Sequence, residues 1–201
     1  MHYDFVDIGT SDFDTSIDKL DQSNLLNILL VEPLTHYLEA LPNYPNVIKD
    51  NVGISNKHSN VKIFYLPEEV IRLHQLPWWL RGCSSIETKH PAVDTELNRK
   101  NLSLDLIKVK NIDVITFDML CKKHSIDSIG YLKIDTEGHE QYILPDVFEK
   151  VKNGFVINNI KFENQEYLGN KKFLDYLRDQ FIQIGYELVA QTDADIIIKK
   201  V

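Results

Sequence analysis

The chain has few cysteines and no long apolar run, and no targeting segment is expected. Its two cysteines, Cys83 and Cys121, lie far apart and outside any CxxC or cysteine–histidine ligand spacing. A disulfide framework and a zinc site are therefore not expected. No apolar run reaches the roughly 18 residues of a membrane span, and no basic stretch before an apolar segment opens the chain. We expect a soluble, cytoplasmic protein with reduced thiols and no membrane partner.

Positive charge is also scarce. The 22 lysines and arginines are scattered and are outnumbered by 30 aspartates and glutamates, so the formal net charge is −8. Binding along nucleic-acid phosphates requires clustered lysine and arginine, so no nucleic-acid partner is expected. A length of 201 residues suits one hydrophobic core, and we predict a single domain over residues 1–201.

Short apolar segments alternate with helix-length segments, which is the pattern of a mostly parallel sheet between helical layers. The predicted strands cover residues 3–8, 27–31, 47–54, 61–66, 130–134 and 155–162, with a further regular segment at 106–117. The segments 47–54 and 61–66 are expected to pair through a turn. Helices are predicted at 34–41 and 118–124, after Gly138, and through Phe173, Leu174, Leu177, Phe181 and Ile184.

The chain ends in two strand-like segments, 186–191 and 195–200, with three residues between them. They are expected to form an antiparallel hairpin, because a parallel crossover needs about a dozen residues or more. The fold class that follows is α/β, a doubly wound and mostly parallel sheet that ends in an antiparallel hairpin.

In such sheets ligands bind beyond the carboxyl ends of the strands. The first strand ends in Asp7-Ile-Gly9-Thr10-Ser11, where a glycine lets backbone amides approach a ligand. An ordinary turn between a strand and a helix would have the same sequence pattern. The second ends at Glu32, 32 − 7 = 25 residues after Asp7. That offset is close to the roughly 20 residues at which a carboxylate reaches the ribose hydroxyls of a nucleotide. Glu32 also suits a helix N-terminus without any ligand.

The third strand end, Leu132 to Glu140, has the most specific pattern. The apolar strand runs into Asp135, Glu137, His139 and Glu140. Carboxylates concentrated at one strand end repel one another, which favours a functional interpretation. His139 by itself is expected to face solvent at a helix start. A fourth end, Phe162-Glu163-Asn164-Gln165, is equally compatible with a functional role and with a strand that stops at the surface.

Four segments taken in order resemble the signature of FkbM-type methyltransferases, which have the Rossmann-like class I methyltransferase fold. They are Val6–Gly9, Leu30–Pro33, Thr116–Leu120 and Leu132–Glu140. The similarity covers roughly residues 3–165, and Lys-Ile-Asp-Thr-Glu-Gly is its most specific element. The chain departs from the family at Gly9-Thr-Ser-Asp-Phe-Asp14, which lacks a further glycine or an alanine-asparagine turn. It also begins almost at the first strand, which leaves open a minimal form, a homo-oligomer or a partner chain that covers the cofactor.

The resemblance implies S-adenosylmethionine as cofactor and O-methylation of a carbohydrate or other small-molecule acceptor. It implies contacts to the methionine part from Asp7, Gly9, Thr10 and Ser11, to the ribose from Glu32 beside Pro33, to the adenine from Gly53, Ile54 and Ser55, and to the sulfonium from Asp135. A hydroxyl acceptor needs a base, and the unranked candidates are Asp135, Glu137, His139 and Glu163.

A metal ion is the less favoured alternative to a carboxylate acting directly. Asp135, Glu163 and Asn164 are expected to end neighbouring strands, and their oxygens would suit Mg²⁺. The irregular stretch 67–104 is predicted to be a substrate-side insertion. Its candidate acceptor contacts are Trp78, Trp79, Arg81, Ser84 and Ser85, with one tryptophan expected in or against the core and the other facing the ligand.

Two other functions remain open on the sequence alone. A nicotinamide-dependent oxidoreductase would share the first-strand glycine and the second-strand acid, but the chain lacks GxGxxG, and a terminal hairpin is more typical of methyltransferases. A non-catalytic methyltransferase-like module for binding or assembly is compatible with the altered glycine turn.

Overall fold

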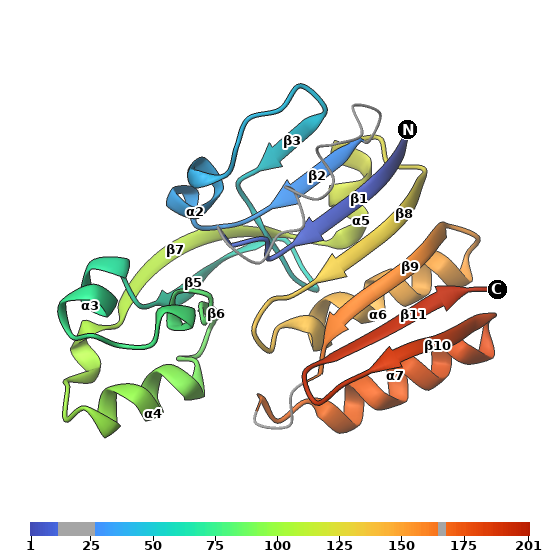
Figure 1. Ribbon diagram of the computed structural model, residues 1–201. Helices are drawn as coiled ribbons and strands as arrows, with labels where there is room; N and C mark the ends of the chain where they lie inside the picture. Colours follow the sequence, from blue (N-terminus) through green and yellow to red (C-terminus); the bar gives the residue numbers. More distant parts are fainter. Residues whose placement is uncertain (12–26, 165–167) are drawn as a thin grey trace.

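A seven-stranded sheet forms the centre of the computed structural model, which describes residues 1–11, 27–164 and 168–201 (Figure 1). The strand order is β10-β11-β9-β8-β1-β2-β3. Strands β3, β2, β1, β8 and β9 are parallel, whereas β11 runs antiparallel to β9 and β10 antiparallel to β11. The predicted α/β fold class is confirmed. The strands are β1 His2–Ile8, β2 Ile28–Val31, β3 Val47–Asp50, β8 Ser128–Ile134, β9 Val156–Glu163, β10 Tyr186–Gln191 and β11 Asp195–Lys200.

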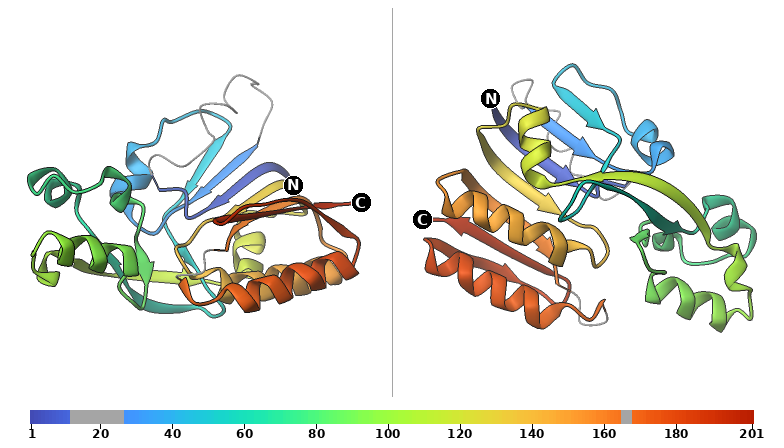
Figure 2. Two further views of the ribbon diagram at one scale, coloured as in Figure 1. Left: turned by 60° about the horizontal axis from the view of Figure 1, so that its bottom comes forward. Right: turned by 180° about the vertical axis from the view of Figure 1, so that it is seen from behind.

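Helices lie on both faces of this sheet. Helices α5 (Phe117–Lys123), α6 (Glu140–Lys152) and α7 (Lys171–Gln183) cover one face side by side (Figure 2). Alternate residues of β1 and β8, such as Val6 and Leu132, point into the core beneath them. On the other face α2 (Thr35–Ala40) packs through Leu38 against Phe5 and Leu30. Within the described ranges no helix is long and apolar enough to cross a membrane.

A second sheet of four strands has the order β4-β7-β5-β6 and extends from the first as an arm (Figure 1). Its strands are β4 Gly53–Ile54, β5 Ser59–Tyr65, β6 Ser85–Ile86 and β7 Lys108–Ile115. The arm carries a lobe, residues 66–107, that contains α3 (Glu68–Leu73), η1 (Trp78–Arg81), α4 (Pro91–Arg99) and η2 (Leu104–Leu106). The lobe has a small core of its own, formed by Leu66, Val70, Ile71, Leu76, Leu80, Cys83, Val93, Leu97 and Ile107.

Three expectations about elements were wrong. The predicted strand 47–54 is two strands in different sheets, since β3 pairs with β2 and β4 pairs with β7. The segment 61–66 does not pair with 47–54, because β5 takes β7 and β6 as its neighbours. The stretch 67–104 contains regular helices, which escaped prediction because α4 buries only Val93 and Leu97.

The end of the chain agrees closely with expectation. The predicted hairpin segments 186–191 and 195–200 are β10 and β11. In α7, Leu174, Leu177 and Phe181 face the core, whereas Phe173 is 42% exposed and lies off the buried stripe.

Candidate active site

A pocket lies at the carboxyl ends of β1, β2 and β8, where ligands bind in sheets of this type. It is also bordered by β4, β5 and β6 of the arm. From the predicted cofactor set it is lined by Gly9, Ser11, Glu32, Pro33, Gly53, Ile54 and Asp135. Residues without a predicted cofactor role also line it, among them Tyr37, Gly82, Ser84, Thr136 and Glu137. The structure therefore brings together strand ends that are far apart in the sequence.

The turn after β1 packs directly on the chain after β8. Gly9 has a φ of +81°, and a Cβ at this position would lie 1.8 Å from the carbonyl oxygen of Asp135. The Gly9 N–H donates to Val31 O at 2.9 Å, which ties the same turn to β2. Glycine is required here because it adopts a positive φ without strain and has no Cβ to clash with Asp135. The rest of the predicted glycine motif, residues 12–14, and also Gln165 lie outside the described residues.

Glu32 is held at the edge of the pocket by two backbone donors. Its Oε1 accepts from the Leu34 N–H at 2.8 Å and its Oε2 from the Ser11 N–H at 3.1 Å. The hydroxyls of Ser11 and Ser84 are buried in the same pocket and have no hydrogen-bond partner in the part of the chain that the structure describes. Buried polar atoms of this kind fit a ligand rich in hydroxyl and charged groups.

Three members of the predicted cofactor set do not line the pocket. Asp7 is fully buried with its Oδ1 3.7 Å from Lys133 Nζ, and the same ammonium is 3.2 Å from Asp135 Oδ2. The Lys133 ammonium therefore links Asp7 to Asp135, which lines the pocket. Thr10 is buried in the turn, and Ser55 lines a different cavity together with His139 and Tyr142.

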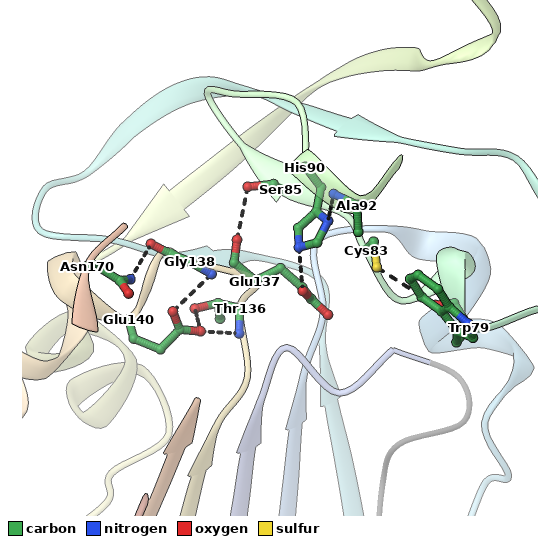
Figure 3. Close-up of polar contacts among 10 residues, drawn as sticks. All are labelled: Trp79, Cys83, Ser85, His90, Ala92, Thr136, Glu137, Gly138, Glu140 and Asn170. Carbon is green, nitrogen blue, oxygen red and sulfur yellow. Dashed lines mark hydrogen bonds and ion pairs between the residues drawn. The ribbon is translucent and has the colours of Figure 1, made fainter. Parts of the chain in front are cut away.

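Glu140 shapes the loop after β8 from within (Figure 3). Its Oε1 accepts from the Thr136 N–H at 2.6 Å and the Thr136 hydroxyl at 2.8 Å, and its Oε2 accepts from the Gly138 N–H at 3.0 Å. Burial raises the pKa of this carboxyl to about 7. Glu140, one of the acids in the segment Leu132–Glu140, therefore stabilises the loop and does not line the pocket.

Glu137 lies at the tip of this loop with a φ of +54°, an uncommon conformation for a residue with a Cβ. The Ser85 hydroxyl donates to its carbonyl oxygen at 3.1 Å. Its carboxylate Oε2 lies 2.9 Å from His90 Nε2, and the His90 side chain is fully buried (Figure 3). His90 Nδ1 accepts from the Ala92 N–H at 3.2 Å as the N-cap of α4.

Sequence reasoning missed His90. The only available signal was a histidine before Pro91, which suits a helix start but names no distant partner. His139 was predicted to face solvent, and this was wrong. It is 5% exposed, its Nε2 is 3.0 Å from Ser55 Oγ, and burial lowers its pKa to about 4. Its ring packs 4.6 Å from that of Tyr142, outside the lining of the pocket.

The carboxylates of Asp135, Glu137 and Glu163 converge, with oxygens within 4.8 Å of one another. Asn164, the third predicted ligand, donates its amide N–H to Asp175 at 3.1 Å, and its Oδ1 is buried without a hydrogen-bond partner among the described residues. The Lys133 ammonium beside Asp135 already supplies a positive charge to this group.

Cys83, His90 and Glu137 converge in the same way. A histidine that binds a metal donates its other ring N–H to an acceptor. His90 does the opposite, since its Nδ1 accepts from Ala92 and the proton of the neutral ring must be on Nε2. Burial raises the pKa of the Cys83 thiol, which keeps it protonated. The hydrogen bonding of this group therefore does not suit a metal ion.

The candidate acceptor residues of the lobe are divided. Ser84 lines the pocket and Ser85 binds Glu137. One tryptophan was expected in or against the core; Trp78 and Trp79 are 64% and 41% exposed, so neither is buried in it. The Arg81 guanidinium stacks 5.9 Å from the centre of the Trp78 ring, and the Arg81 carbonyl accepts from the Tyr37 hydroxyl at 2.6 Å. That last bond attaches α2, beside Glu32, to the lobe.

Comparison with known proteins gives one finding. The family model of a methyltransferase FkbM domain matches residues 7–188, whereas no curated protein and no solved structure matches the chain. The match includes the second sheet, the lobe, the lining of the pocket and the first sheet except β11 and parts of β1 and β10. It favours a methyltransferase over the oxidoreductase and the non-catalytic module. The chain belongs to the FkbM methyltransferase family and is an S-adenosylmethionine-dependent methyltransferase.

Proposed function

We propose that this enzyme methylates a hydroxyl group of a small-molecule acceptor, preferably a carbohydrate, and that Glu137 is the base. The observation that carries the proposal is the position of Glu137, which lines the pocket and whose carboxylate Oε2 lies 2.9 Å from His90 Nε2. A hydroxyl is a weak nucleophile, so its methylation requires a positioned group that accepts its proton.

The lining of the pocket fits the cofactor. Glu32 would accept the ribose hydroxyls, Gly53 and Ile54 would border the adenine, and Gly9 and Ser11 would lie along the methionine part. When bound, S-adenosylmethionine supplies a methyl group that its positively charged sulfur activates for displacement. Glu32, Asp135 and Glu137 give the pocket an acidic lining, which attracts a cationic ligand.

Glu137 is favoured over the other three candidate bases by its surroundings. Glu163 and His139 do not line the pocket, and the His139 ring faces Ser55. Asp135 lines it but forms an ion pair with Lys133, and taking up a proton would break that ion pair. Glu137 contacts a histidine whose geometry indicates a neutral ring, so proton uptake by Glu137 breaks no ion pair.

A carbohydrate is the preferred acceptor because the chain resembles a family that often methylates sugars. The exposed faces of Trp78 and Trp79 support this choice, since aromatic rings offer broad apolar surfaces on which sugar rings can stack. Both tryptophans belong to the lobe, which borders the pocket through Gly82 and Ser84.

The test uses purified enzyme, S-adenosylmethionine and a panel of methyl glycosides, phenols and carboxylic acids, with mass spectrometry of the products. Wild type is expected to methylate a glycoside hydroxyl. Glu137→Gln is expected to lose on the order of 100-fold in kcat while binding the cofactor normally by calorimetry. Methylation of carboxylic acids alone would contradict the hydroxyl assignment, and full activity in Glu137→Gln would contradict the base. Purified protein that retains S-adenosylhomocysteine would support a working cofactor site.

A further inference from the structure

We infer that His90 is the positioning residue of Glu137, holding the carboxylate toward the pocket through its Nε2–H. This rests on the proposed function of Glu137 as base. The two residues come from separate parts of the fold, the N-cap of α4 in the lobe and the loop after β8 (Figure 3). The lobe would then contribute to chemistry as well as to acceptor binding.

The protonation of His90 follows from its second nitrogen. Nδ1 accepts from the Ala92 N–H at 3.2 Å, so this nitrogen carries a lone pair and no proton. The ring is then neutral with its proton on Nε2, which lies 2.9 Å from Glu137 Oε2. Because the His90 side chain is fully buried, bulk water does not compete with Glu137 for that proton.

The backbone of Glu137 is fixed by a different set of contacts. The Ser85 hydroxyl holds its carbonyl oxygen, and Glu140 binds the N–H groups of Thr136 and Gly138 on either side. These contacts maintain the positive φ of Glu137. With the backbone held in this way, His90 is left to select the direction of the side chain, and a base placed in advance needs no reorganisation during the reaction.

Two variants separate positioning from helix capping. Asparagine is a good N-cap, so His90→Asn keeps an acceptor for the Ala92 N–H but is too short to reach Glu137. Glutamine is longer, and the amide N–H of His90→Gln can take the place of Nε2–H. If His90 only caps α4, His90→Asn should have the kcat of wild type. If His90 positions Glu137, the kcat of His90→Gln should be closer to that of wild type than the kcat of His90→Asn.

The first measurement needs no acceptor. Long-range ¹H–¹⁵N spectra of labelled protein report the protonation of each histidine ring, and the His90 signals are those missing from His90→Asn. We expect the Nε2–H tautomer near neutral pH. An Nδ1–H tautomer or a doubly protonated ring would overturn the inference, because neither is compatible with acceptance from Ala92 and donation to Glu137.

The second measurement is methyl transfer to the glycoside panel. His90→Asn is expected to lose on the order of 100-fold in kcat at a temperature where it remains folded, with an unchanged KM and calorimetric Kd for S-adenosylmethionine. His90→Gln is expected to recover about tenfold or more of that loss. Equal losses in both variants, or wild-type kcat in His90→Asn, would overturn the inference.

Failure of the proposed base is recognisable separately. Wild-type activity in Glu137→Gln refutes the base and with it the catalytic part played by His90. Lost activity in Glu137→Gln together with full activity in His90→Asn refutes only the positioning. If no glycoside is methylated, the acceptor class is refuted and the tautomer spectrum decides the inference about His90.

Discussion

The α-carbon of Gly9 faces the carbonyl oxygen of Asp135 so closely that a methyl group there would lie 1.8 Å from this oxygen. This approach joins the turn after β1 to the chain after β8, and the pocket is built on that junction. The Asp135 N–H also donates to Ile8 O at 2.9 Å, so the two segments are bonded as well as packed.

Gly9→Ala is therefore expected to prevent stable folding or to lower the melting temperature severely. The matched control is Gly154→Ala, because Gly154 also has a positive φ, +96°, but no described atom beyond its own residue and its chain neighbours lies within 4 Å of the position of a Cβ. The control should lose only the ~1–2 kcal/mol of the left-handed conformation. Thermal unfolding of both variants decides the matter, and similar losses would show that the contact with Asp135 is unimportant.

Glu32→Ala is expected to weaken S-adenosylmethionine binding by about tenfold or more, because charge-assisted hydrogen bonds are worth roughly 1.5–3 kcal/mol. The Ser11 and Leu34 N–H groups lose their acceptor in the same variant, so a moderate drop in melting temperature should accompany the change. Calorimetry measures the affinity. Glu39→Ala, an exposed acid on α2, is the control, and an affinity loss as large in Glu39→Ala would argue for long-range charge instead.

His139 should make the fold sensitive to acid. Burial lowers its pKa from 6.5 to about 4, so the folded state binds this proton less readily than the unfolded state. The stability that follows is present above pH 6.5 and is lost as the pH falls toward 4. Relative to His139→Gln, wild type is expected to lose up to about 3 kcal/mol of unfolding free energy over this window. Urea titrations at several pH values test this, and parallel pH profiles of the two proteins would contradict it.

Changing both Trp78 and Trp79 to alanine is expected to spare folding and cofactor binding, because both side chains are exposed and neither lines the pocket. The KM for a glycoside acceptor should rise about tenfold, the equivalent of ~1.4 kcal/mol of lost stacking. Leu73→Ala, at a 76% exposed position of the same lobe, serves as the control. An unchanged acceptor KM in the double variant would remove the tryptophans from acceptor binding.

Features that depend on neighbouring residues could be predicted from the sequence. Three residues between 186–191 and 195–200 leave no room for a parallel crossover, so a hairpin was the only connection. The segments that became β1, β2, β8 and β9 were apparent because strands of a buried parallel sheet are rich in apolar residues, as in Ile28–Val31. The acids after Ile134 also predicted a functional loop after β8, because they follow the strand directly in the sequence.

Features that depend on residues far apart were established by the folded chain alone. Val114 pairs with Ser59 across 114 − 59 = 55 residues, and no local pattern names such a partner. His90 and Glu137 meet across 137 − 90 = 47 residues because the arm brings the lobe over the carboxyl ends of the strands. The burial of His139 and the exposure of Trp79 were likewise set by packing, since a side chain's surroundings come from every element that folds around it.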